Sequence, residues 1–226
     1  MGTRKALEKS NLKAGIDEAG RGAVIGPMVI ACIVLPSGRE RELLDLGVRD
    51  SKLLTPKARE QMYNEICSKT SCVLVRKVQP AEIDLALSGK GLNHLEARII
   101  AELIERAGAS VVYVDAPQSN PRSFETLLRF LSSSRIKIIA EPFADKKYSL
   151  VSAASIVAKV VRDREIERIK GIYGDLGSGY PSDPKTREFL ASLIAEKEIP
   201  PIVRKSWQTY LRMNEKSRSR TLEDFT

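Results

Sequence analysis

Side chains that bind soft metals or stack on bases are scarce in this sequence of 226 residues. It contains three cysteines and one histidine, and aromatic residues make up 5% of the chain. Zinc sites use closely spaced cysteine and histidine ligands, so the scattered Cys32, Cys67, Cys72 and His94 do not predict one. The low aromatic content also argues against an RNA-recognition fold, which stacks bases on aromatic rings. Any bound metal is therefore expected to have oxygen ligands.

Long apolar segments are also missing. No run reaches 18 consecutive apolar residues, so the sequence predicts no transmembrane helix and no membrane partner. Residues 1–13 are polar and carry charges of both signs, unlike a secretory signal, and we therefore expect a cytoplasmic protein. The pattern G-x-x-x-x-G-K-[ST] does not occur, which excludes a P-loop phosphotransferase.

The chain has an excess of positive charge. Its 37 lysines and arginines outnumber 29 acidic residues, which gives a net charge of +8 and a pI of about 9.4. Such an excess favours a polyanionic partner, because contacts to phosphate release counterions and speed encounter. Many basic proteins bind no nucleic acid, so charge alone leaves the partner open. The content of 42% hydrophobic and 29% charged residues is that of a globular protein.

The hydrophobic pattern alternates between the periods of strands and helices. It predicts strands over 13–18, 28–35, 72–78, 111–115 and 136–140, and helices over 56–69, 92–107, 121–131, 149–169, 186–196 and 206–213. Strands dominate the first part of the chain and helices the last. We therefore expect an α/β fold, in which a mixed sheet is flanked by helices and followed by a helical C-terminal region. Residues 1–213 would form one domain that includes the helical C-terminal region, and 214–226 a flexible tail.

Acidic residues stand at the ends of predicted strands. Asp17 and Glu18 end the first strand, Asp115 ends the fourth, and Asp145 follows the fifth. A carboxylate beside buried strands is costly unless it is paired or binds a metal. Neighbouring strand residues point to opposite faces, so Asp17 and Glu18 can share a site only if the chain turns there, as Gly20 permits. Each acid alone is more often a loop or helix-capping carboxylate. Together they predict a site for hard cations such as Mg²⁺ or Mn²⁺.

Several motifs, in order along the chain, resemble ribonuclease HII, the type 2 ribonuclease H, and most of all its archaeal branch. The resemblance extends from Gly15 to about Met213. One six-residue motif would be weak support, but a series of them over most of the chain is specific. The matching segments are 17–22 (DEAGRG), 50–52 (DSK), 91–93 (GLN), 114–116 (VDA), 144–145 (AD), 151–159 (VSAASIVAK), 162–163 (RD) and 177–181 (GSGYP).

The resemblance implies a ribonuclease H-like fold with a two-metal active site that holds Mg²⁺ or Mn²⁺. The catalytic residues and metal ligands that it implies are Asp17, Glu18, Asp115 and Asp145. The implied activity is endonucleolytic hydrolysis of the RNA strand in RNA–DNA hybrids, and cleavage 5′ to single ribonucleotides in duplex DNA. The products would carry 3′-hydroxyl and 5′-phosphate ends, and we expect the enzyme to be a monomer.

Substrate contacts are expected from a glycine-rich loop and from basic side chains. The backbone of Gly20, Arg21 and Gly22 can approach a ligand closely and would bond the 2′-hydroxyl that distinguishes RNA from DNA. The resemblance adds Tyr180, whose ring would pack on the sugar of the next nucleotide. Ser155 and Lys159 share a helix face with Arg162, which suggests a phosphate-binding row. Lys52 and Lys146 are further candidates, although most lysines are simply solvated.

The C-terminal residues 219–226 resemble, in part, the box with which replication and repair proteins bind a sliding clamp, proliferating cell nuclear antigen. Only Leu222 and Phe225 fit that box, one helical turn apart, as a short helix filling an apolar pocket requires. Ser219 and Thr226 stand where the box usually has glutamine and a second aromatic residue. The alternative is an unbound, mobile terminus.

Two other functions are compatible with parts of this pattern. A non-catalytic duplex-binding module could keep the basic surface, but four acids beside phosphates would repel its ligand unless metal were present. Another nuclease or a recombinase could share the arrangement of acids, although the loop at 20–22 together with Tyr180 favours the type 2 ribonuclease. The basic segment 204–220 could embrace the nucleic-acid backbone or act as an ordinary solubilising tail.

Overall fold

The computed structural model describes residues 11–48, 55–117, 119–132 and 136–223, and side chains up to 217. The chain divides into two compact units. Unit 1 comprises 1–18, 30–76 and 96–160, and unit 2 comprises 19–29, 77–95 and 161–226. Lys52 and Phe225 lie outside the described residues.

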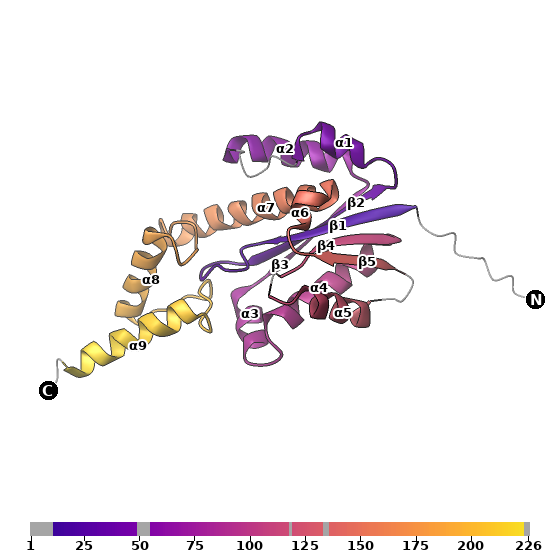
Figure 1. Cartoon of the computed structure of the whole chain (residues 1–226). Coiled ribbons are helices and arrows are strands. Elements are labelled where there is room, and N and C mark those ends of the chain that lie inside the picture. The colour runs from indigo at the N-terminus through magenta and orange to yellow at the C-terminus, as the bar shows by residue number, and fades with distance from the viewer. Residues whose placement is uncertain (1–10, 49–54, 118, 133–135, 224–226) are drawn as a thin grey trace, which may run out of the picture. The chain divides into compact units, whose positions relative to one another are not determined.

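Within the described residues, the strands form one five-stranded mixed sheet, which belongs to unit 1 except for a few strand ends (Figure 1). The strand order is β3-β2-β1-β4-β5, and β1 pairs in parallel with β4 as β4 does with β5. The continuous apolar run at 28–35 is the inner strand β2, which is buried along almost its whole length, whereas burial alternates along β4 and β5. The strands are β1 (Leu12–Ala19), β2 (Met28–Pro36), β3 (Cys72–Val78), β4 (Val111–Asp115) and β5 (Lys137–Glu141).

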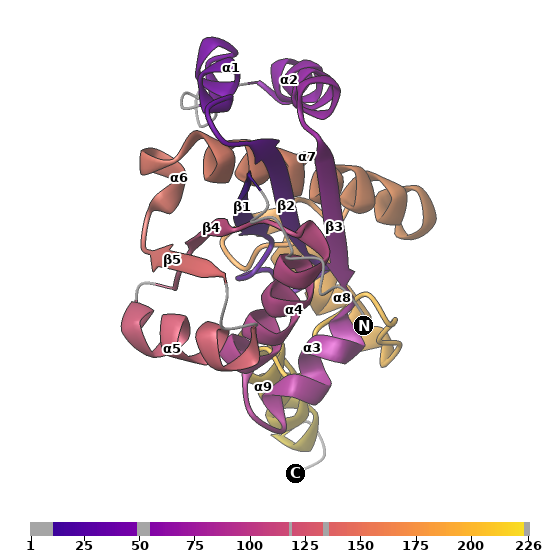
Figure 2. The same ribbon diagram turned by 90° about the vertical axis from the view of Figure 1, so that its right-hand side faces the viewer.

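Helices cover both faces of the sheet in unit 1. The first part of α7 (Ser149–Tyr173) and α6 (Ala144–Lys147) lie on one face, and α4 (Leu92–Ala107) and α5 (Pro121–Leu131) on the other (Figure 2). Gly15 of β1 makes this close packing possible, because a Cβ there would lie 2.3 Å from the Leu150 backbone. Two further helices, α1 (Glu40–Asp45) and α2 (Pro56–Lys69), complete the unit. α2 begins where Thr55 caps it, with Pro56 in its first turn.

Unit 2 is mainly helical. It contains α3 (Pro80–Leu87), the second part of α7, α8 (Pro184–Glu196) and α9 (Gln208–Glu223). Residues 20–27 form a loop, which we call the GRG loop. The amides of Val24 and Ile25 donate to the Gly179 carbonyl, at 2.9 and 3.1 Å. The core of the unit is formed by buried residues of the helices, of the GRG loop and of the segments that connect the helices, namely Val24, Ile25, Ile166, Ile169, Leu176, Leu190, Leu193, Ile194 and Val203.

The predicted fold class and every predicted element are confirmed. Three short helices were not predicted: α1, α3 and α6. Helix α7 continues to Tyr173, four residues beyond its predicted end, and α9 continues to Glu223. The predicted domain boundary at 213 is therefore not the end of an element, since α9 runs through it. Among the described residues, no helix is both long and apolar enough to cross a membrane.

Candidate active site

Asp17 and Asp115 lie at the carboxyl ends of adjacent parallel strands. The register pairs Gly15 with Tyr113 and Ile16 with Val114, so Asp17 and Asp115 are the next two residues to face each other. Residues paired in this way point to the same face of the sheet, about 4.8 Å apart along the hydrogen-bonding direction. The sheet therefore brings together two of the acids that the sequence singled out.

Helix α6 carries Asp145 close to this pair. After β5 the chain turns at Phe143, whose φ of 58° lies in the left-handed region that few residues other than glycine adopt. The turn points the amide of Ala144 at Asp115, and it donates to the Asp115 Oδ1 at 2.7 Å. The backbone carbonyl of Asp145 accepts a hydrogen bond from the Ser152 hydroxyl of α7. Asp145 is thus fixed on both sides by unit 1.

The carboxyl group of Asp17 is held in an environment that disfavours its charge. Its side chain is 6% exposed, and burial, followed by repulsion from Asp115, raises its pKa to about 7. Three neighbours act in the opposite direction: the Ser155 hydroxyl, the Glu18 amide at 2.7 Å from Oδ1, and the charge of Lys159. A cation beside both carboxylates would remove the repulsion that raises this pKa.

Ser155 and Lys159 act on Asp17 from α7. Ser155 is 2% exposed, and its Oγ accepts a hydrogen bond from the Lys159 Nζ at 2.9 Å. Arg162 is also buried, with 4% exposure. The expected phosphate-binding row of these three residues does not fit this burial, because Ser155 and Arg162 have almost no surface to offer a duplex. Ser155 instead orients Asp17, and only Lys159 keeps partial exposure.

The four predicted acids all belong to unit 1. Asp17 and Asp115 are neighbours and Asp145 is tied to Asp115, whereas Glu18 follows Asp17 in the strand and is partly exposed. Across the described residues, no three Asp, Glu, His or Cys side chains are already gathered closely enough to hold a metal ion. The donor set nonetheless suits a hard cation, because it consists of carboxylate oxygens and one of them is destabilised by its like-charged neighbour.

Sequence reasoning overlooked a further acid at this sheet edge. Glu141 of β5 is paired in register with Asp115. Its carboxylate forms an ion pair with Lys147 and accepts a hydrogen bond from the Tyr148 hydroxyl at 3.2 Å. The hydrogen bond from Lys147 lowers the pKa of Glu141, against the effect of partial burial. Because its charge is already compensated, Glu141 is a poorer candidate for a metal ligand than Asp17 and Asp115.

Unit 2 brings together the residues expected to recognise ribose. The Gly20 amide donates to the Tyr180 hydroxyl at 3.1 Å, and the Arg162 guanidinium lies 4.5 Å from the centre of the Tyr180 ring. Arg21 donates to the Asn93 side chain at 2.6 Å, and Gly22 is exposed. The loop and the tyrosine were predicted separately from motifs far apart in the sequence, and the structure places them in contact.

The segment 204–220 was expected either to contact the nucleic-acid backbone or to act as a solubilising tail, and neither interpretation holds for its first residue, Arg204. Its side chain is fully buried, and its guanidinium donates to backbone carbonyls of the GRG loop. Burial, followed by repulsion from Arg162, lowers the pKa of Arg204 to about 9. The available signal was its position between the apolar Val203 and Trp207, which is unusual for a solvated basic tail.

The remaining predicted substrate contacts are less well defined. Lys146 is exposed, and its ammonium group lies 4.7 Å from the centre of the Phe143 ring. Lys52 cannot be placed, because it lies outside the described residues. Leu222 lies within α9, but its side chain is outside the part of the structure that is described.

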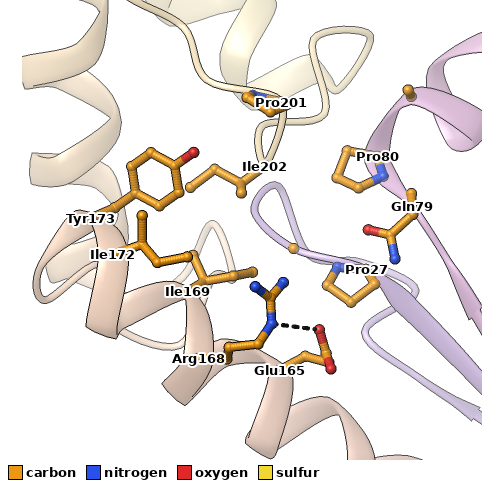
Figure 3. A pocket seen from close by; sticks show the side chains of 12 residues that line it. Pro27, Gln79, Pro80, Glu165, Arg168, Ile169, Ile172, Tyr173, Pro201 and Ile202 are labelled. Atoms are coloured by element: carbon orange, nitrogen blue, oxygen red, sulfur yellow. Dashed lines mark hydrogen bonds and ion pairs between the residues drawn. The ribbon is translucent and has the colours of Figure 1, made fainter.

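A pocket of about 330 Å³ lies in unit 2, and none of the predicted site residues lines it (Figure 3). Its walls are mainly apolar, and the ion pair between Arg168 and Glu165 lies beside them at 3.3 Å. It contains none of the acids described above, so it lacks the chemistry of the predicted site. The apolar part of its wall consists of Pro27, Pro80, Ile169, Ile172, Pro201 and Ile202.

Comparison with solved structures assigns the architecture to the ribonucleases H. The ribonuclease H2 from Pyrococcus horikoshii OT3 superposes with a TM-score of 0.85 at 42% identity, covering 92% of this chain and 99% of that one. Ribonuclease HII in the PCNA:RNase HII complex from Archaeoglobus fulgidus gives 0.81 at 45% identity, covering 87% and 94%. At 20% identity, Bst-RNase HIII in complex with Mn²⁺ shares the fold, with a TM-score of 0.73 over 93% of this chain and 71% of that one.

Sequence comparison identifies the family. The family model for Ribonuclease HII matches residues 14–210. Ribonuclease HII from Caldivirga maquilingensis is 50% identical over 214 residues, which cover 94% of this chain and 97% of the relative. The protein from Thermofilum pendens is 47% identical, covering 88% and 98%. The chain therefore belongs to the ribonuclease HII family and is an endoribonuclease, a hydrolase of phosphodiester bonds.

Proposed function

We propose that this enzyme hydrolyses the RNA strand of RNA–DNA hybrids, cuts 5′ to single ribonucleotides in duplex DNA, and leaves 3′-hydroxyl and 5′-phosphate ends. The observation that carries the proposal is the pair Asp17 and Asp115 at one sheet edge, with the Asp17 pKa raised towards 7. Such an arrangement is unfavourable without a cation and favourable with one. Family membership supports the substrate class, and the net charge of +8 suits a polyanion.

The residues fit Mg²⁺ or Mn²⁺, and we propose Asp17, Glu18, Asp115 and Asp145 as the ligands. Two divalent ions held by these residues would supply activation of water and stabilisation of the departing oxygen of a phosphodiester. The Mn²⁺ complex of Bst-RNase HIII shows that a protein of this fold binds such an ion. In this chain, Ser155 orients the Asp17 carboxylate, while the Ala144 amide fixes Asp115 beside it. The Lys159 charge favours the ionised form of Asp17, the form that binds a cation.

Recognition of ribose is proposed for the GRG loop with Tyr180, and Lys146 and Lys159 are proposed to contact phosphates. The loop presents an exposed glycine, Gly22, whose backbone a substrate can approach without a Cβ in the way. The Tyr180 ring is partly exposed and is held in place by Gly20 and Arg162. Both features suit a surface that reads the sugar of one nucleotide.

The proposed function is tested by cleavage of an RNA–DNA hybrid labelled on the RNA strand. We expect cleavage with Mg²⁺ or Mn²⁺ and none after the metal is chelated with EDTA. An RNA–RNA duplex of the same sequence serves as the control substrate and should remain intact. Equal cleavage with and without chelator would contradict the proposed site.

Two substitutions of Tyr180 should distinguish the contribution of its ring to cleavage from that of its hydroxyl. We expect Tyr180→Ala to depress cleavage at a lone ribonucleotide strongly, and Tyr180→Phe much less, because the ring supplies the proposed contact with the sugar. Stability should change little in Tyr180→Phe, whose only loss is the hydrogen bond from Gly20, worth about 1 kcal/mol. Rates and melting temperatures of both variants are the measurement. Full activity in Tyr180→Ala, or a loss that merely follows unfolding, would exclude the ring as the reader of the sugar.

We propose that the C-terminal residues bind a sliding clamp through Leu222 and Phe225. The complex of PCNA with the Archaeoglobus fulgidus relative, 45% identical to this chain, supports such a partner. The full chain should retain the clamp in a pull-down, whereas a chain ending at Lys216 should not. Leu222→Ala with Phe225→Ala provides a test that leaves chain length unchanged. Equal retention of the clamp by all three proteins would refute the assignment.

A further inference from the structure

Arg204 connects both ends of the GRG loop through backbone carbonyls. Its Nη2 donates to the Gly20 carbonyl at 2.7 Å, and its Nη1 donates to the Arg21 carbonyl at 2.9 Å. The Gly26 carbonyl accepts from Nε at 3.1 Å and from Nη2 at 3.0 Å. One planar group thereby fixes the separation between the start and the end of the loop.

The side chain of Arg204 is itself held firmly. Its guanidinium lies 5.1 Å from the centre of the Trp207 ring, and its amide donates to the Val24 carbonyl at 2.9 Å. The carboxylate of Asp84 accepts from the amides of Lys205 and Ser206, at 2.9 and 3.0 Å, which fixes the next two residues of the chain. Because the Arg204 backbone and guanidinium are both held by these contacts, the side chain can fix the conformation of the loop.

These contacts depend on the planar arrangement of donors in the guanidinium group, which a positive charge alone would not provide. In the described part of the chain, the hydrogen bonds of Arg204 go to carbonyls, so the group is used as a rigid fork of donors. A second buried arginine, Arg162, lies against the same loop: a Cβ at Gly20 would lie 2.2 Å from its Nε. Its guanidinium also supports the Tyr180 ring. Two buried arginines thus shape the surface that carries Gly20 and Tyr180.

We propose that Arg204 is a positioning residue for ribose recognition: by holding the carbonyls of Gly20, Arg21 and Gly26, it sets the backbone of the GRG loop that reads the 2′-hydroxyl. The inference rests on the proposed role of this loop. It assigns no contact with substrate to Arg204, which is fully buried. Loss of the fork should therefore impair reading of the 2′-hydroxyl more than general affinity for a duplex, which depends on surface charges.

The test compares Arg204→Lys with the wild type and with Arg187→Lys, which makes the same substitution at an exposed position of α8. Lysine keeps the charge but cannot reproduce the planar fork. Two kinetic quantities are measured: kcat/KM on a DNA duplex with one ribonucleotide, and the inhibition constant of the all-DNA duplex as competitor. Amide hydrogen exchange of residues 23–26 is followed in all three proteins, and circular dichroism confirms that each is folded.

For Arg204→Lys we expect kcat/KM at the lone ribonucleotide to fall about tenfold or more, with less than a twofold change in the inhibition constant, and faster exchange at residues 23–26. Arg187→Lys should match the wild type in kcat/KM, in the inhibition constant and in hydrogen exchange. If hydrogen exchange at residues 23–26 is unchanged in a folded Arg204→Lys protein, the proposal is overturned whatever the activity. It is also overturned if affinity for the all-DNA duplex falls by the same factor as kcat/KM. If the wild type did not cleave at a lone ribonucleotide, the proposed function would fail, while hydrogen exchange would still decide whether Arg204 holds the loop. If Arg204→Lys does not fold, Asp84→Asn, which weakens the anchor of the neighbouring residues, is subjected to the same measurements and criteria.

Discussion

Replacement of Asp17, Asp115 or Asp145 by asparagine should lower turnover by several orders of magnitude and leave the protein folded. Each change removes one of the proposed negative ligands for a divalent cation, while the nearly equal size of asparagine preserves packing. The amide of Ala144 can still donate to the carbonyl oxygen of an asparagine at 115. Single-turnover cleavage of the hybrid at saturating Mg²⁺, together with circular dichroism, measures both expectations.

Glu141→Gln is the matched control for these variants. It removes the same charge from the same sheet edge, one strand away from Asp115, but from a carboxylate already paired with Lys147. We therefore expect near-normal turnover. Activity close to that of the wild type in an Asp variant would remove that residue from the ligand set. A loss in Glu141→Gln as large as in the Asp variants would show that the sheet edge as a whole, and not the named acids, is required.

The second large effect is on stability, and it depends on pH. The pKa of Asp17 is raised to about 7 in the folded protein from its ordinary value of 3.8. Between these values the folded state binds a proton that the unfolded state does not, so metal-free protein should gain stability as the pH falls from about 8 towards 4. Read in the opposite direction, this stability is lost as the pH rises through about 7. Each pKa unit corresponds to about 1.4 kcal/mol, so the contribution is a few kcal/mol.

Asp17→Asn isolates this contribution, because asparagine cannot ionise. In EDTA at pH 8 the variant should melt several degrees above the wild type, and at pH 5 the difference should be clearly smaller, vanishing only below the ordinary pKa of 3.8. Mg²⁺ at pH 8 should stabilise the wild type more than the variant, since binding to the folded state alone raises stability. Melting curves at pH 5 and 8, with and without Mg²⁺, provide the measurement. A difference between the two proteins that is the same at both pH values would contradict the raised pKa.

Much of the fold could be predicted because its signals are local. The apolar run of β2 marks a buried strand, and Thr55 as the cap with Pro56 in the first turn marks the start of α2. The short helices α1 and α6 have neither a side-chain cap nor a proline in the first turn, and α3 begins with Pro80 but has no side-chain cap. The turn before α6 depends on a left-handed Phe143, and no local rule places a phenylalanine there. The position of Asp145 beside Asp115 therefore could not be predicted from local sequence signals.

The proximity of two acids could be expected from sequence, whereas the surroundings of the neighbouring residues could not. Asp17 and Asp115 end strands that pair in parallel, so the prediction that they meet followed from topology. The role of Ser155 was misjudged because helical spacing reveals which residues share a face but not what that face covers. Arg204 was misjudged for a related reason: its partners are backbone carbonyls about 180 residues earlier, and sequence composition cannot distinguish it from the basic residues that follow.

The proposed function is tested most directly on a DNA duplex with a single ribonucleotide, end-labelled on the strand that carries it. With Mg²⁺ we expect one cut, immediately 5′ to the ribonucleotide, which leaves a 3′-hydroxyl on the upstream fragment and a 5′-phosphate on the ribonucleotide. With EDTA we expect intact duplex, and with Asp145→Asn in Mg²⁺ we expect almost no product. Tight binding of the duplex without any cut in Mg²⁺ or Mn²⁺ would instead indicate a duplex-binding module, and undiminished cleavage in EDTA would contradict a metal site built from these acids.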